Sequence, residues 1–216
     1  MVMGSIKAVS SGHDLRVEVR TREVKAMKVA TVGTNAYLPG PRWADYLFTS
    51  TSFAWLWLVM RLYLGYQWIS AATEKIGSPA WIGGGAGLAI KGFVTGALQQ
   101  TTGQHPAVQS WYGQFLKLVV LPHAVFFSYL VTVGELAVGV AMVLGLFTAI
   151  AASVGWLMNL AYLLAGAVGL NPVMLVMETL LILAWRTAGW WGMDRFALQQ
   201  VGTPEQPGRM FKRHAR

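Results

Sequence analysis

Four long stretches of the chain consist mainly of apolar residues. They comprise residues 53–73, 123–146, 149–169 and 172–190. Each is close to the ~20 residues that a helix needs to cross the hydrocarbon core of a bilayer. The connections after the second and third stretches are very short, so we expect these helices to run antiparallel. The pattern therefore predicts an all-α integral membrane protein built as a four-helix bundle.

The segment between the first two stretches, about residues 77–122, is too long to be a simple turn. Apolar residues recur in it with helical spacing, at 88–98 and again at 108–119. Both runs are amphipathic and shorter than a span, so we expect an outer loop that carries interfacial or re-entrant helices. The glycine-rich residues 83–87 match neither common phosphate-loop pattern and predict a flexible elbow.

The distribution of charge predicts the topology. Of the 216 residues, 55% are hydrophobic and 12% are charged, with 17 Lys and Arg against 9 Asp and Glu. Most basic residues lie in 1–50 and 191–216, and such residues concentrate on the cytoplasmic side of a membrane. We therefore expect a multi-pass protein of the plasma membrane with both termini in the cytoplasm. This distribution does not form the basic face that nucleic-acid binding requires.

The chain accordingly divides into three predicted parts. Residues 1–52 form a basic cytoplasmic extension, residues 53–190 the membrane domain, and residues 191–216 a basic cytoplasmic tail. Tryptophans are common near membrane interfaces. We expect Trp55, Trp57, Trp185, Trp190 and Trp191 to form an inner belt, with Trp68 and Trp81 in an outer one. The alternative for some of these is a place in the core, where we expect Trp156.

Three ionisable residues lie well inside the predicted spans, where a charge costs a few kcal/mol. At about 1.5 Å per residue, Arg61, Glu135 and Glu178 lie roughly 12, 16 and 18 Å from the inner ends of their helices. They are expected at similar depths and could meet in the bundle. Asn159 lies at a comparable level, and Gln67 continues a polar path toward the outside.

Two interpretations of this cluster remain open. An Arg–Glu pair can hold helices in one arrangement without any catalytic role. Alternatively, a polar pocket could bind a small molecule or relay a proton to a quinone carbonyl. In that case Arg61, Glu135 and Glu178 are the catalytic candidates, and Arg61, Gln67, Glu135 and Asn159 would bind the cofactor. Toward the outside, Lys75, His105 and His123 could bind an anionic substrate, although loop lysines are commonly just solvated.

The available ligands restrict the cofactors that we expect. The chain has no cysteine, so it has no thiolate for an Fe–S cluster or a Cys zinc site. Its four histidines lie outside the predicted helix interiors, where a membrane haem would need its ligands. We find no flavin fingerprint and predict no metal site. No haem, flavin or Fe–S cluster is expected in this chain, and a quinone is one candidate cofactor for the polar pocket.

Several segments resemble the DoxX/DoxD membrane proteins. The first helix of that family is similar to RLYLGYQWISAATEKI, Arg61–Ile76, and a second family segment is similar to GELAVGVAMVLGLFT, Gly134–Thr148. Asn171–Pro172 and Gly192–Met193–Asp194–Arg195 also fit. The long loop with Trp81, Gly92–Phe93 and Trp111 is closer to the DoxD type. The resemblance covers about residues 53–198.

The resemblance implies a four-helix bundle and a function in respiration. DoxD is the small subunit of thiosulfate:quinone oxidoreductase, so the chain is expected to help transfer electrons from thiosulfate to quinone within a membrane complex. The lipid bilayer and at least one protein partner are therefore the expected partners. The alternative is a non-catalytic accessory or anchoring subunit of a larger membrane complex.

Overall fold

The computed structural model describes residues 41–203 and 206–207. The chain divides into two compact units, Met1–Pro41 and Arg42–Arg216, and the described residues belong almost entirely to the second. Most of the predicted extension 1–52 and the end of the predicted tail 191–216 therefore lie outside the described residues. The account below concerns the second unit.

The four predicted helices are present, and each begins within one residue of its expected start, but the third and the fourth end five and seven residues earlier than predicted. They are α3 (Ala54–Ile76), α6 (Ala124–Leu144), α7 (Thr148–Leu164) and α8 (Asn171–Leu183). Pro172 lies in the first turn of α8, where its missing N–H costs no helical hydrogen bond. Two two-residue strands, β1 (Gly202–Thr203) and β2 (Gln206–Pro207), pair antiparallel. The described residues are otherwise helical or in connections, which confirms the predicted all-α class.

Fewer than the four predicted helices are both long enough and apolar enough to count as membrane spans. Among the described helices, α6 satisfies both requirements alone. The helix α2 (Arg42–Thr49) satisfies them together with Thr51–Ile76, across a bend of 61°. The apolar helices α7 and α8 have 17 and 13 residues. These lengths establish one candidate span, or two if the bent pair crosses as one, and do not by themselves establish four.

Two glycines allow α3 and α6 to touch along their backbones. A Cβ at Gly139 of α6 would lie 2.7 Å from Ile69 Cγ1 and 2.9 Å from Ile69 N. A Cβ at Gly65 of α3 would lie 2.7 Å from Val143 Cγ2 and 3.0 Å from the Gly139 carbonyl oxygen. Small residues at such crossings are typical of helices that pack without a strong hydrophobic driving force. The contact fixes how α3 lies against α6.

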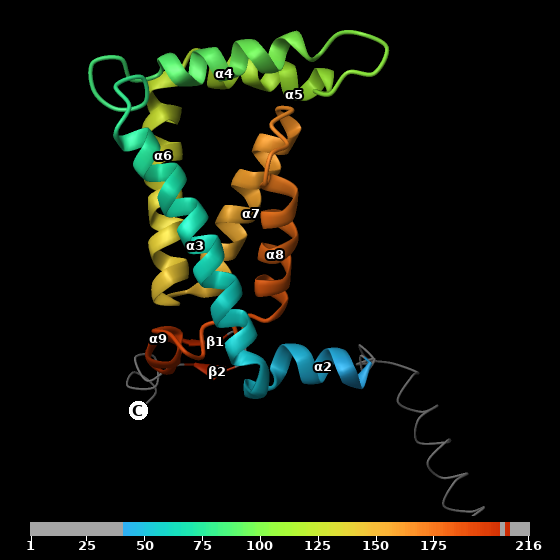
Figure 1. Ribbon diagram of the computed structural model, residues 1–216, viewed down its shortest axis with the longest axis vertical. Coiled ribbons are helices and arrows are strands. Elements are labelled where there is room, and N and C mark those ends of the chain that lie inside the picture. The colour runs from blue at the N-terminus through green and yellow to red at the C-terminus, as the bar shows by residue number, and fades with distance from the viewer. Residues whose placement is uncertain (1–40, 204–205, 208–216) are drawn as a thin grey trace, which may run out of the picture. The chain divides into compact units, whose positions relative to one another are not determined.

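The outer-loop helices are also present and lie across one end of the four long helices (Figure 1). They are α4 (Leu88–Gln99), α5 (Ser110–Phe115) and the π-helical turn η2 (Leu116–Val120), which together we call the platform. Their own small core includes Val94, Val108 and Leu116. The Tyr112 hydroxyl donates to the Ala161 carbonyl at 2.9 Å, which attaches the platform to α7.

The glycine-rich residues 83–87 form the turn that leads into the platform. Gly87 has φ +92°, and a Cβ there would lie 2.9 Å from Val125 N. The turn therefore crosses closely over the start of α6, where only glycine fits. Ser128 of α6 donates to the Trp81 carbonyl at 2.6 Å and holds the chain just before this turn.

The end of the unit opposite the platform carries α2 and α9 (Asp194–Val201) (Figure 1). Large aromatic side chains are exposed on α2, on α9 and on residues that lie near these helices in the sequence: Trp43, Tyr46, Trp55, Trp191 and Phe196. Two tryptophans expected in membrane belts lie elsewhere. Trp57 and Trp68 are buried in the bundle core, with 1% and 2% of their surface exposed, so their assignment to belts is wrong. Both face neighbouring helices, which spacing along one helix cannot reveal.

The α3–α6 contact gives a first testable prediction. Replacing Gly139 with alanine should lower the stability of the bundle by about 1–3 kcal/mol, because the added methyl overlaps Ile69 and its backbone. Thermal unfolding in detergent micelles measures the change. The matched control is Gly96→Ala in α4, where a Cβ meets no atom within 4 Å and helix propensity improves. Equal unfolding temperatures for the two variants would contradict the proposed close contact.

Candidate functional site

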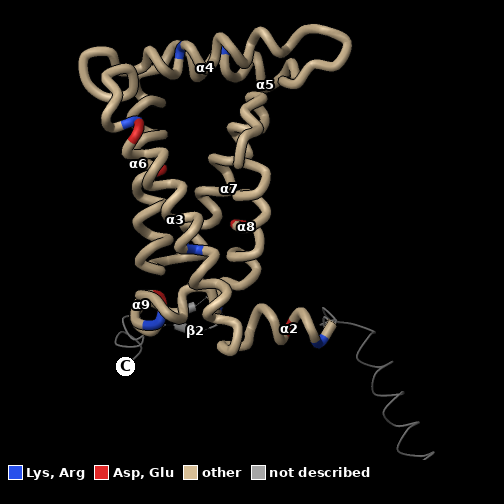
Figure 2. Tube along the Cα trace, viewed as in Figure 1, with Lys and Arg blue, Asp and Glu red and all other residues tan. Residues whose placement is uncertain are grey.

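Charged side chains are sparse along the four long helices (Figure 2). In particular, α7 carries none. The buried ionisable residues that the sequence singles out are all in place, since Arg61, Glu135 and Glu178 are each at most 1% exposed. Each has different hydrogen-bond partners.

Arg61 binds backbone oxygens at the end of α6. Its guanidinium donates to the carbonyls of Met142 and Val143 at 2.9 and 3.0 Å, and to that of Trp191 at 2.8 Å. The last carbonyls of a helix have no partner within it, and the helix dipole favours a cation there. Arg61 therefore caps α6 and attaches the segment that follows α8.

Asp194 performs the converse role at the start of α7. Its carboxylate accepts from the backbone N–H groups of Phe147 and Thr148, at 2.5 and 3.0 Å. The backbone N–H of Asp194 donates to the Gly145 carbonyl at 2.7 Å. Gly145 has φ +62°, and a Cβ there would overlap the Arg61 guanidinium. We call Arg61, Gly145, Trp191 and Asp194 the clamp, because together they fix the α6–α7 turn.

Glu178 of α8 is bound by two neutral donors. Trp68 Nε1 of α3 donates to Oε1 at 2.9 Å, and Asn159 Nδ2 of α7 donates to Oε2 at 2.8 Å. A Cβ at Gly155 would overlap Oε1, so this glycine makes room for the carboxylate. The cluster joins α3, α7 and α8 through one buried side chain. Asn159 Oδ1 is buried beside it without a hydrogen-bond partner.

Glu135 of α6 lies nearer the platform and joins a cation and a phenol. Its Oε1 accepts from the Tyr162 hydroxyl at 2.7 Å, and its Oε2 forms an ion pair with Lys75 Nζ at 2.8 Å. Lys75 also lies 4.9 Å from the centroid of the Trp81 ring. We call Lys75, Glu135 and Tyr162 the triad. The Lys75 side chain is 17% exposed, so the triad connects the surface to the bundle interior.

The three buried charges do not meet, although the sequence placed them at similar depths. Arg61 lies level with Met142 in the last turn of α6, whereas Glu135 lies seven residues earlier on α6, so ~10 Å away along the helix, and pairs with Lys75. The depth estimate failed because α3 extends past the end of α6. A depth counted from the end of one helix is therefore not comparable with a depth on another.

The other candidate residues have simple positions. Asn159 joins Glu178 as described, and Lys75 joins Glu135. Gln67 donates to the Tyr63 hydroxyl at 3.1 Å on the same helix. His105 is exposed between α4 and α5, and exposed His123 precedes α6 with Nδ1 2.9 Å from the Val119 carbonyl oxygen. Binding of an anion by Lys75, His105 and His123 stays a prediction.

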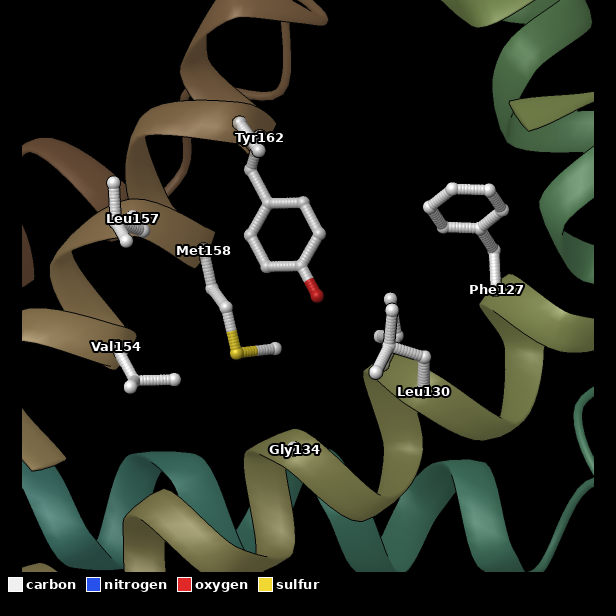
Figure 3. Close-up of a pocket in the computed structure, with 9 residues that line it drawn as sticks. Phe127, Leu130, Gly134, Val154, Leu157, Met158 and Tyr162 are labelled. Carbon is white, nitrogen blue, oxygen red and sulfur yellow. The ribbon is translucent and has the colours of Figure 1, made fainter. Parts of the chain in front are cut away.

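A groove between α6 and α7 lies against the triad (Figure 3). It encloses about 330 Å³. Its lining is Phe127, Leu130, Val131, Gly134, Val154, Leu157, Met158, Ala161 and Tyr162. The Tyr162 ring extends from α7 toward α6, and its hydroxyl is the polar group among these side chains (Figure 3). The groove thus suits a mainly apolar ligand with one hydrogen-bonding oxygen.

Two side chains in these clusters were missed by the sequence reasoning. Tyr162 was not considered, and Trp68 was expected in an outer belt. The available signal is helical spacing, because Tyr162 lies one turn from Asn159 on α7 and Trp68 lies two turns from Arg61 on α3. Neither spacing specifies a partner. Among the described residues, no group of three or more His, Cys, Asp or Glu is arranged to hold a metal ion.

Comparison with known proteins connects this arrangement to a family. A family model described as "TQO small subunit DoxD" matches residues 56–208. No curated protein and no solved structure matches the chain. The matched range includes the clamp, the triad and every residue that lines the groove.

The clamp gives a second testable prediction. The substitution Asp194→Asn should cost about 1–3 kcal/mol of stability, because an amide cannot accept from both the Phe147 and the Thr148 N–H groups. Thermal unfolding in detergent measures the loss. The exposed Asp45 of α2 provides the matched control, and Asp45→Asn should unfold at the wild-type temperature. If the two variants behave alike, Asp194 does not stabilise the start of α7.

Proposed function

The chain belongs to the DoxD family, and on that premise we propose that it is a membrane subunit of a quinone-linked oxidoreductase of the thiosulfate:quinone oxidoreductase type. The observation that carries the proposal is the Tyr162 hydroxyl, which lies at an apolar groove and is hydrogen-bonded to Glu135. The membrane placement, the ligand and the electron donor are considered in turn.

All four long helices are proposed to cross the membrane. Large apolar side chains point outward from the bundle on all four of them, including Val59, Val133, Ile150 and Val176. The 17 residues of α7 lie at the lower end of the ~17–25 that span a bilayer. The helix α8 has 13 residues, and the turns after it continue the segment to Trp190, with Arg186 and Thr187 as their polar residues. Exposed apolar faces of this kind are covered by lipid chains.

The proposed orientation follows from the two ends of the unit. Both α2 and α9 lie opposite the platform (Figure 1). They belong to the basic segments 1–50 and 191–216. Because basic residues favour the cytoplasmic side, we assign this end to the cytoplasm of the plasma membrane and the platform to the outside. The triad then lies in the outer half of the bilayer.

The groove fits a quinone better than a charged substrate. A quinone has an apolar ring, an apolar tail and carbonyl oxygens that accept hydrogen bonds. The groove offers apolar side chains and one hydroxyl. Within the described part of the chain no Lys or Arg lines the groove, and Lys75 is paired with Glu135, so an anion such as thiosulfate would lack a positive partner there. When bound, a quinone would supply an acceptor for two electrons and two protons.

The protonation of Glu135 determines what Tyr162 presents to the groove. When Glu135 is ionised, the Tyr162 hydroxyl donates a hydrogen bond to the carboxylate, and the lone pairs of the phenol oxygen can accept from a donor in the groove. When Glu135 is protonated, the carboxyl can donate to the phenol oxygen, and the hydroxyl is released to donate toward a carbonyl. Lys75, which reaches the surface, can supply that proton to Glu135. The triad therefore supports proton transfer between the outer surface and the groove.

Thiosulfate oxidation is assigned to a partner. The chain has no cysteine, so it cannot form a thiol-linked sulfur intermediate of its own. A protein partner within a larger membrane complex, docked on this subunit, would deliver the electrons. The alternative is a non-catalytic anchoring subunit, and this alternative applies if changes in the groove do not affect turnover of the complex.

A third testable prediction concerns Tyr162. In the complex purified with its native partner, Tyr162→Phe should lower the rate of thiosulfate-dependent quinone reduction by at least about tenfold, since general acid–base groups typically contribute more than that. Glu135→Gln should act in the same direction. The matched control is Tyr63→Phe, which removes an exposed hydroxyl whose partner is Gln67 and should leave the rate unchanged. Wild-type rates for both Tyr162→Phe and Glu135→Gln would refute the quinone site and leave the anchoring role.

A further inference from the structure

The groove at Tyr162 continues along the bundle toward the clamp. A second cavity of about 290 Å³ lies between the same two helices and shares Gly134 and Val154 with the first. It extends to Leu146 and Phe147 in the α6–α7 turn. From Tyr162 to Phe147 the rise along α7 is ~22 Å. We call the two cavities together the seam.

Helix packing does not require the glycine at the centre of the seam. A Cβ at Gly134 would meet only Met158, with Sδ at 3.5 Å and Cε at 3.6 Å, which is ordinary van der Waals contact. Gly139, five residues further on, differs because backbone of α3 lies against it. The missing side chain at Gly134 therefore leaves space where the two cavities adjoin, and this space is not needed for helix packing.

The polarity of the seam is asymmetric. Its lining side chains are apolar apart from Tyr162, which lies at the platform end. Ala137, Ala141 and Ala151 line the half nearer the clamp. Exposed Leu130, Val154 and Leu157 border the seam, so it opens sideways to the surface where lipid chains would lie. A ligand dissolved in the bilayer could thus enter without passing through water.

We propose that the seam binds the extended isoprenoid tail of a membrane quinone whose head lies at Tyr162. The inference rests on the proposed function for the identity of the head, and on the seam itself for the tail. A phospholipid fits less well, because its phosphate would have to lie beside one neutral hydroxyl, with Lys75 already paired. The tail would run from the triad toward the clamp, between α6 and α7.

The test compares quinones that share one head but differ in the tail. In nanodiscs containing the complex, the wild type should show a KM at least about tenfold lower for the long-tailed quinone than for the tail-less one, with concentrations expressed per lipid. Gly134→Leu should abolish this difference in KM by filling the centre of the seam. Ala137→Leu, at a position that lines the second cavity and not the groove at Tyr162, should reduce the difference and leave kcat with the tail-less quinone unchanged. Val133→Leu, whose exposed side chain lies outside the seam, should behave as wild type.

A labelling experiment separates failure of the tail site from failure of the quinone function. A photoreactive isoprenoid alcohol should label α6 and α7 in wild type and Val133→Leu, and much less in Gly134→Leu. Undiminished labelling of Gly134→Leu, or equal labelling of the seam by a photoreactive phospholipid, would show only surrounding lipid and overturn the tail site. Selective labelling without reduction of any quinone would instead support the tail site and overturn the proposed function.

Discussion

A charge inside an apolar bundle must find a partner, because an unpaired one costs several kcal/mol. This constraint determines where the helices of this protein meet. Arg61 brings α3 to the end of α6, Glu135 joins α3, α6 and α7, and Glu178 joins α3, α7 and α8. Every long helix therefore takes part in at least one buried polar contact. Apolar packing alone would allow these helices to slide or rotate, and the polar contacts select one register.

The long helices could be predicted because runs of about 20 mainly apolar residues are easily recognised in a sequence. The residues that contact one another between these helices could not be predicted. The sequence indicated correctly that Arg61, Glu135 and Glu178 are buried. It could not show that Arg61 binds backbone carbonyls. Every residue has a backbone carbonyl, so the residue type does not indicate which ones Arg61 will bind. The burial of Trp68 and the importance of Tyr162 depend on which face of a helix meets which neighbour. That choice is made by contacts such as Gly65 against Gly139, which are tertiary.

The segments that resemble the family have mainly structural explanations. Within Gly134–Thr148, Gly139 admits α3, and Gly145 makes room for the Arg61 guanidinium. Asp194 binds the N–H groups at the start of α7. These residues of the resembling segments therefore close one end of the bundle. The proposed chemistry depends on other residues, the triad and the lining of the seam, at the other end and along one flank of the same helices.

The clamp also bears on how the protein is made. Arg61 and the start of α7 are completed by Trp191 and Asp194, which leave the ribosome long after α3, α6 and α7 have been synthesised. During translation, the guanidinium lacks one of its carbonyl partners and the first N–H groups of α7 lack their carboxylate. Closure of this end therefore requires synthesis to continue past Asp194. A product truncated before residue 191 would contain all four long helices and still expose an unfinished end to the proteases that remove incomplete membrane proteins.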